Sequence, residues 1–240
     1  MSVGAVSAAE PIRHMAVVVP CRNEERTLAA CIAHVRGAMD RLAETAPGCG
    51  VTLTVVLDSC TDASALIARA AADADPRIRT LDVGYGSVGR SRRAGVHSAL
   101  AVVADDEPAW IACTDADTRV PPGWLARFLE FADDGADAVL GTVEPDRAEL
   151  GPRRHAAWSA RHVRTDGHDY VHGANLGVRA SSYLAVGGFT HLRTGEDVAL
   201  VAALRAAGLD VRSSGALHAV TSGRLDGRAP GGFAGYLARL

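Results

Sequence analysis

The chain has 240 residues, of which 48% are hydrophobic and 22% are charged, and its formal net charge is −3. This balance is typical of a globular protein and gives no general attraction to nucleic acid or to an anionic membrane. All 25 basic residues are arginines, which excludes the lysine of a Walker phosphate loop or of a Schiff-base enzyme. The five cysteines form no Cys-x-x-Cys motif, and their odd number predicts free thiols in a reducing compartment.

The first 14 residues are expected to be an N-terminal tail. Residues 1–10 contain neither the basic segment nor the apolar segment of a secretory leader. No run in the chain approaches the roughly 18 apolar residues of a membrane span. We therefore expect a soluble, cytoplasmic protein.

Strand and helix patterns alternate from residue 15 to residue 143. Helical spacing of apolar residues follows Asn23, Thr61, Arg90 and Pro121, and Asn23 is the expected N-cap of the first helix. Series of this kind build a doubly wound, mostly parallel sheet with right-handed crossovers, so the predicted fold class is α/β. The predicted strands are the apolar runs 15–20, 51–57, 78–83, 110–113 and 138–143.

The alternation of strand and helix patterns ends after residue 143. Residues 144–172 carry charged side chains and four histidines, which fits a substrate-facing loop and helix or, equally, an ordinary exposed connection. A small helix ending at Val186, a helix from about Glu196 to Gly208, and a pair of strands at 211–212 and 217–220 are expected next. No repeat or linker divides the chain, so one domain is expected.

Two carboxylates one residue apart, Asp115 and Asp117, directly follow the apolar run 110–113. Ligands of an open α/β sheet bind at the carboxyl ends of its strands. Two oxygen ligands on one tight turn suit a divalent cation that also holds phosphate oxygens. The alternative is an Asx turn at Asp115 and a solvated Asp117 before the next helix.

Five features occur in one order along the chain: the sequence Val-Val-Val-Pro-Cys-Arg-Asn-Glu at 17–24, Asp58, the segment Gly89–Gly95, the Thr-Asp-Ala-Asp at 114–117, and the Gly-Glu-Asp at 195–197. This ordered set resembles the family 2 glycosyltransferases of GT-A fold over roughly residues 15 to 225. The resemblance implies transfer of a sugar from a nucleoside diphosphate to an acceptor hydroxyl, with inversion at the anomeric carbon and with Mg²⁺ or Mn²⁺. It divides the domain 15–240 into a nucleotide-sugar half, 15–120, and an acceptor and catalytic half, 121–240.

The resemblance also implies roles for individual residues. It assigns the general base to Asp197, beside Glu196, and the chief metal contact to Asp117, with Asp115 toward the ribose and the metal. The nucleotide-sugar side would comprise Pro20, Arg22, Glu24, Asp58, Arg92 and Asp115. Asn175 and Arg179 would border the acceptor side, and His218 is the candidate for a further metal ligand. Arg93 stands where the family usually has Asn.

Each assignment has a structural alternative. Asp58 suits an N-terminal cap for the helix after Thr61, and Thr194 with Asp197 is close to a capping box. The arginines at 92 and 93 fit a solvated helix face, Asn175 and Arg179 fit a strand edge, and a lone late histidine such as His218 is often a surface residue.

Two other classes of function share some of these features. A phosphatase of the haloacid-dehalogenase type also uses Asp-x-Asp after a strand, but it needs a downstream lysine that this chain lacks. A non-catalytic nucleotide-sugar binder of the same fold remains the alternative. The expected partners are a nucleoside-diphosphate sugar and a hydroxyl acceptor, and Asp58 is compatible with recognition of uracil or guanine. The tail 224–240 has an amphipathic pattern and offers contact with a membrane or another subunit.

Overall fold

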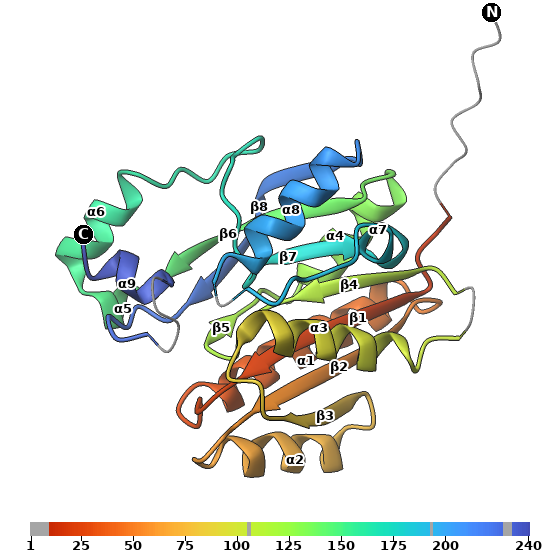
Figure 1. Ribbon diagram of the computed structural model, residues 1–240, viewed down its shortest axis with the longest axis horizontal. Coiled ribbons are helices and arrows are strands. Elements are labelled where there is room, and N and C mark those ends of the chain that lie inside the picture. Colours follow the sequence, from red (N-terminus) through yellow and green to blue (C-terminus); the bar gives the residue numbers. More distant parts are fainter. Residues whose placement is uncertain (1–9, 105–106, 193, 228–231) are drawn as a thin grey trace, which may run out of the picture.

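The computed structural model describes residues 10–104, 107–192, 194–227 and 232–240, so most of the predicted N-terminal tail and residues 228–231 of the C-terminal tail lie outside the described residues. Within these ranges eight strands form one sheet, in the order β3-β2-β1-β4-β7-β6-β8-β5, with helices on both faces (Figure 1). The strands are β1 (His14–Cys21), β2 (Gly50–Asp58), β3 (Ile78–Val83), β4 (Ala109–Cys113), β5 (Thr118–Arg119), β6 (Ala138–Pro145), β7 (Leu176–Arg179) and β8 (Val211–Thr221). The helices are α1 (Leu28–Thr45), α2 (Ser64–Ala74), α3 (Val88–Leu100), α4 (Trp124–Asp133), α5 (Arg147–Leu150), α6 (Pro152–Ser159), α7 (Ala180–Ala185), α8 (Glu196–Ala206) and α9 (Phe233–Leu237).

The predicted α/β class and the mostly parallel sheet are confirmed. Strands β3, β2, β1 and β4 are all parallel, and β6 is parallel to β8. Strand β7 runs antiparallel between β4 and β6. The reversal follows from the connection: after β6 the chain does not cross back over a face of the sheet, so β7 starts at the edge where β6 ends.

The sheet separates two apolar cores, because successive side chains of a strand point to opposite faces. On β1, Met15, Val17 and Val19 join the core under α1, α2 and α4. Ala16 and Val18 join the core under α3, α7 and α8. The continuous apolar run of β1 is therefore the signature of a strand that is covered on both faces.

Helix α3 approaches the sheet so closely that one position on it requires glycine. A Cβ atom at Gly95 would lie 2.6 Å from the side chains of Val18 and Val56. At Gly37 of α1 a Cβ atom would meet nothing within 4 Å. We expect Gly95→Ala to lower the free energy of unfolding by about 1–3 kcal/mol, and Gly37→Ala to raise it by about 0.5–1 kcal/mol. Urea unfolding of the two variants checks this, and equal effects would contradict the close approach of α3.

Two local predictions are wrong. The N-cap of α1 is Thr27, not Asn23. Asn23 adopts a φ of 55°, and its Oδ1 accepts a hydrogen bond from the Thr61 N–H at 2.7 Å, because the loops after β1 and β2 lie side by side. The strands expected at 211–212 and 217–220 are one strand, β8, whose register against β6 shifts between Gly141 and Thr142.

The C-terminal segment packs on its own chain. Leu237 of α9 is fully buried with Leu150 and Trp158 of α5 and α6, and Phe233 and Tyr236 pack against the same cluster. The apolar side of the tail is thus covered by this chain. None of the helices in the described ranges is long and apolar enough to cross a bilayer.

Candidate active site

A cavity of about 640 Å³ lies at the carboxyl ends of β1, β2 and β4. The start of α3, the loop 171–174, the segment 194–197 and the residues after β8 complete its walls. It brings together nine residues predicted for the site: Pro20, Arg22, Glu24, Asp58, Arg92, Asp115, Asp117, Glu196 and Asp197. Segments as distant in sequence as Pro20 and Asp197 therefore meet at one edge of the sheet, the edge expected to bind ligands.

Asp58 is held by its own chain. Its Oδ1 accepts hydrogen bonds from the N–H groups of Tyr85 and Gly86, both at 2.8 Å, and its Oδ2 accepts from the Ser87 N–H at 3.0 Å and the Ser91 hydroxyl at 2.8 Å. Burial acts to raise the pKa of Asp58, but these donors lower it overall. Asp58 thus fixes the turn before α3, and not the helix after Thr61 as the structural alternative proposed.

Arg92 joins the two acidic motifs. Its guanidinium is 4% exposed and forms ion pairs with Asp115 and Glu196. Burial acts to lower the pKa of Arg92, and the two carboxylates more than reverse this. Burial raises the pKa of Glu196, which Arg92 only partly opposes. A Cβ atom at Gly173 would lie 2.6 Å from this guanidinium, so the loop 171–174 passes too close for any other residue.

The neighbouring Arg93 has a separate partner. Its Nη1 donates to the carbonyl oxygens of Gly187, at 2.5 Å, and Phe189, at 3.0 Å. The residue that replaces the usual Asn of the family therefore anchors the 187–189 turn to α3. Neither Arg92 nor Arg93 lies on a solvated helix face in the way that the structural alternative supposed.

Asp117 is one of two neighbouring carboxylates in the cavity that could hold a metal ion. Burial, and then the neighbouring Asp115, raise its pKa to about 6, and Arg224 opposes this rise with an ion pair at 2.8 Å. Mg²⁺ in nucleotide enzymes is commonly held by one or two carboxylates, with phosphate oxygens and water filling the other positions. The pair Asp115 and Asp117 fits that pattern, although the described residues contain no group of three or more side chains that could hold a metal by themselves.

Asp197 lies at the start of α8 without the capping box that the sequence allowed. The N-cap is Gly195, and it makes no side-chain cap hydrogen bond. The Oδ2 of Asp197 accepts from the Gly173 N–H at 2.7 Å, and its Oδ1 accepts from the Val198 N–H at 2.9 Å. Two backbone donors therefore hold the carboxylate at the wall of the cavity.

Asn175 and Arg179 do not reach the cavity. Asn175 is fully buried, and its Nδ2 donates to the carbonyls of Thr142 and Leu217 at 2.8 and 3.0 Å, which ties β6 to β8. Arg179 pairs in register with Trp110, at the end of β4 opposite to Asp115. Its Nη2 donates to the Ala132 carbonyl at 2.6 Å. The predicted acceptor-side position is therefore wrong for Arg179, because β7 runs from the site edge to the far edge of the sheet.

His218 belongs to a different cluster. Its Nε2 lies 3.1 Å from Glu144 Oε2, and its Nδ1 lies 3.1 Å from the Thr142 hydroxyl. His218 is not among the residues that line the main cavity. The structure therefore does not bring the predicted third metal ligand together with Asp115 and Asp117.

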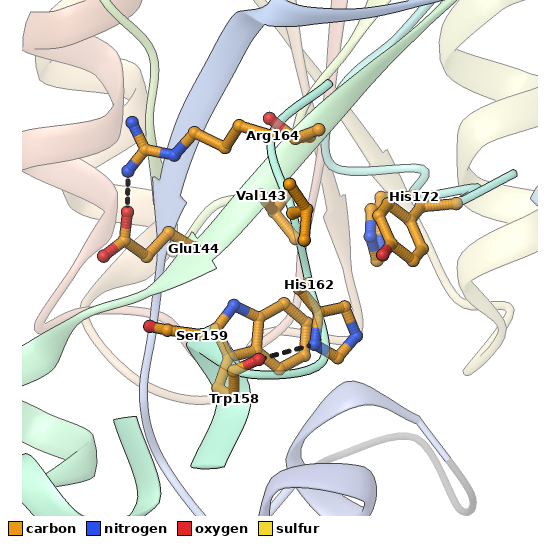
Figure 2. Close-up of a pocket in the computed structure, with 10 residues that line it drawn as sticks. Val143, Glu144, Trp158, Ser159, His162, Arg164 and His172 are labelled. Carbon is orange, nitrogen blue, oxygen red and sulfur yellow. Dashed lines mark hydrogen bonds and ion pairs between the residues drawn. The ribbon is translucent and has the colours of Figure 1, made fainter. Parts of the chain in front are cut away.

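A side cavity of about 150 Å³ opens between Glu144 and His172. Figure 2 shows Arg164 and Glu144 pointing toward each other and His162 stacked over Trp158. His172 and Val143 line both cavities, so the two are adjacent. Burial lowers the pKa of His172 to about 4, which leaves it neutral at pH 7. The segment 144–172 thus forms a wall of the site region.

Three participants were missed at the level of sequence. Arg224 bridges Glu24 and Asp117, Gly173 supplies the N–H that holds Asp197, and Tyr236 of α9 lines the main cavity. The available signal is the Thr-Ser-Gly-Arg at 221–224, where the last strand ends. The sequence pattern places its arginine only at the start of the amphipathic tail 224–240.

Solved glycosyltransferase structures share this architecture. The mannosyltransferase PcManGT from Pyrobaculum calidifontis, solved with GDP-Man and Mn²⁺, matches 97% of this chain and 71% of its own, with a TM-score of 0.62 and 19% identity. GalNAc-T7, solved with UDP, GalNAc and Mn²⁺, matches 89% of this chain and 44% of its own, with a TM-score of 0.65 and 9% identity. The fold is that of the GT-A glycosyltransferases.

The sequence comparisons define the family. The profile described as glycosyl transferase family 2 matches residues 16–183, and the chain belongs to that family. An undecaprenyl-phosphate 4-deoxy-4-formamido-L-arabinose transferase from Edwardsiella ictaluri is 32% identical over 147 residues, which are 61% of this chain and 42% of that protein. The chain thus spans less than half the length of this relative. Membership in a family of transferases confirms the prediction of an enzyme.

Proposed function

We propose that this glycosyltransferase moves a sugar from a nucleoside diphosphate to an acceptor hydroxyl, with inversion, and that it uses Mg²⁺ or Mn²⁺. One observation carries the proposal: Asp115, Asp117 and Asp197 line a single cavity at the ligand-binding edge of the sheet. The GDP-Man and UDP complexes with Mn²⁺ named for the two structural neighbours support the same donor class. Pro20, Arg22 and Glu24 line the cavity beside Asp117 and are the proposed nucleoside contacts.

The proposed roles follow from charge. The leaving diphosphate gains negative charge as the glycosidic bond breaks. A divalent cation held by Asp117 and Asp115 would supply Lewis-acid stabilisation of that charge. Asp197 takes the proton from the acceptor hydroxyl, and the Gly173 N–H orients its carboxylate. The neutral His172 and the adjacent side cavity lie on the proposed acceptor side.

The metal assignment predicts the behaviour of one variant. Asp117→Asn keeps the size of the side chain but removes its charge, so we expect a folded protein that has lost most Mn²⁺-dependent binding of nucleoside diphosphate. Calorimetric titration of GDP and UDP with and without Mn²⁺ measures this. Asp133→Asn, at the exposed end of α4, is the matched control and should bind as the wild type does. Undiminished Mn²⁺-dependent binding by Asp117→Asn would contradict the assignment.

A phosphate acceptor is the second candidate, and the undecaprenyl-phosphate name of the sequence relative favours it. A phosphate monoester is already ionised at neutral pH, since its second pKa is about 6, so it requires no general base. Transfer to a short polyprenyl phosphate and to simple glycoside alcohols, assayed side by side, separates the two.

A cytoplasmic location, and contact of the tail with a membrane or a second copy of the chain, stay predictions.

A further inference from the structure

Arg224 lies between the two acidic sides of the cavity. Its Nη1 and Nη2 donate to both carboxylate oxygens of Glu24, at 2.8 and 2.7 Å, and its Nη2 also lies 2.8 Å from Asp117 Oδ2. The side chain of Arg224 is 31% exposed, whereas those of Glu24 and Asp117 are 8% and 12% exposed. One guanidinium from near the C-terminus thus pairs with two largely buried carboxylates from the N-terminal half of the chain.

The cavity carries more negative than positive side chains, so the contact of Arg224 affects its net charge. Among the described residues, six carboxylates and three guanidinium groups line the cavity. Arg92 is engaged by Asp115 and Glu196, and among the described residues Arg224 is the arginine that forms an ion pair with Asp117. Without Arg224, Asp117 would lose this ion pair while Asp115 stays beside it in the cavity, and neighbouring carboxylates attract a divalent cation.

A metal ion held by Asp117 would have to share the carboxylate with Arg224. The Oδ1 of Asp117 already accepts weak hydrogen bonds from the hydroxyls of Thr221 and Thr118, at 3.3 and 3.4 Å. Arg224 occupies Oδ2. A dication bound at Oδ2 would stand within a few ångströms of the guanidinium, and the two like charges would repel each other in a partly buried site.

We propose that Arg224 is an internal counter-cation that holds the metal-binding carboxylate until a diphosphate arrives. This rests on the proposed metal-dependent function. The diphosphate supplies the negative charge that the displaced guanidinium needs, so metal and diphosphate bind well together and the metal binds poorly alone. Because coupling between two ligands is reciprocal, each must raise the affinity of the other by the same factor.

The test measures binding of Mn²⁺ alone, by the loss of the free-ion electron paramagnetic resonance signal. We expect Arg224→Gln to bind Mn²⁺ about tenfold or more tightly than the wild type, because one opposing charge has left the site. Arg224→Lys keeps the charge but loses the bidentate fork, and should lie between the two. Arg239→Gln, an exposed position in the same tail, is the matched control and should leave Mn²⁺ binding unchanged.

A second measurement uses the wild type only, so the inference does not depend on the folding of a variant. Saturating UDP or GDP should raise the affinity of the wild type for Mn²⁺ about tenfold or more. Equal affinity with and without nucleotide, or equal Mn²⁺ affinity of Arg224→Gln and the wild type, overturns the role of Arg224 and leaves the metal proposal standing. Absence of Mn²⁺ binding in every protein, even with nucleotide, overturns both.

Discussion

Replacing Asp197 by asparagine is expected to lower transfer to a hydroxyl acceptor by about a hundredfold to ten-thousandfold, the usual size of a lost acid–base step. Donor affinity should stay near the wild-type value, because the proposed donor contacts lie on Asp117, Glu24 and Arg22. The amide keeps one oxygen for the Gly173 N–H, so the loop 171–174 stays in place. Single-turnover transfer, normalised to folded protein and with donor affinity measured in parallel, checks the prediction.

The matched control for this variant is Asp73→Asn, which makes the same change at an exposed position of α2 that does not line the cavity. If Asp197 only stabilises the start of α8, Asp197→Asn should lower the free energy of unfolding by about 1 kcal/mol and leave turnover unchanged. An unchanged rate with a slightly lower Tm therefore rules out Asp197 as the base. If Asp197→Asn transfers to a polyprenyl phosphate at the wild-type rate but has lost transfer to a hydroxyl acceptor, the phosphate acceptor does not need Asp197 as a base.

Replacing Arg92 by methionine should cost about 3–5 kcal/mol of unfolding free energy at pH 7, because it leaves Asp115 and Glu196 without their buried partner. Burial already raises the pKa of Glu196. A carboxyl group whose pKa is higher in the folded state than in the unfolded state binds more protons when folded, so its penalty grows as the pH rises through that window. The deficit of the variant should therefore shrink as the pH falls toward 5. Urea unfolding at pH 5 and pH 7 measures both effects.

Two comparisons isolate the buried pair. Arg90→Met removes a guanidinium from the exposed side of the same helix, where it lies over the Tyr85 ring, and should cost less than about 1 kcal/mol. The double variant Arg92→Met with Glu196→Gln should recover part of the loss, since one uncompensated charge has gone. Equal costs for the two methionine variants would show that Arg92 is not the counter-ion of the acidic motifs.

The pattern of residues along the chain was enough to predict most of the framework. Apolar runs of strand length and helical spacing follow from local burial, and β3 begins and ends at the predicted residues, 78 and 83. The Asp-x-Asp turn was recognisable because it directly follows a strand at the ligand-binding edge, and the Gly-Glu-Asp segment because it completes the ordered set of motifs that resembles the family 2 glycosyltransferases. Strands β5 and β7 were not predicted, because two and four residues are too few to show a periodic pattern.

Only the tertiary structure decided which charges meet. Asp58 and Asp115 both stand at the end of a predicted strand, so the sequence does not distinguish them. In the structure the Asp58 carboxylate accepts hydrogen bonds from backbone N–H groups of the turn before α3, whereas Asp115 forms an ion pair with Arg92. The direction of β7 sends Arg179 to the far edge of the sheet, and the return of the chain after β8 brings Arg224 onto Asp117. Hydrophobic periodicity reports whether a side chain is buried, but the partner of a buried charge depends on contacts between segments that are distant in sequence. For this protein the local pattern therefore determined the sheet and its ligand-binding edge, and the packing of the C-terminal half determined the electrostatics of the cavity.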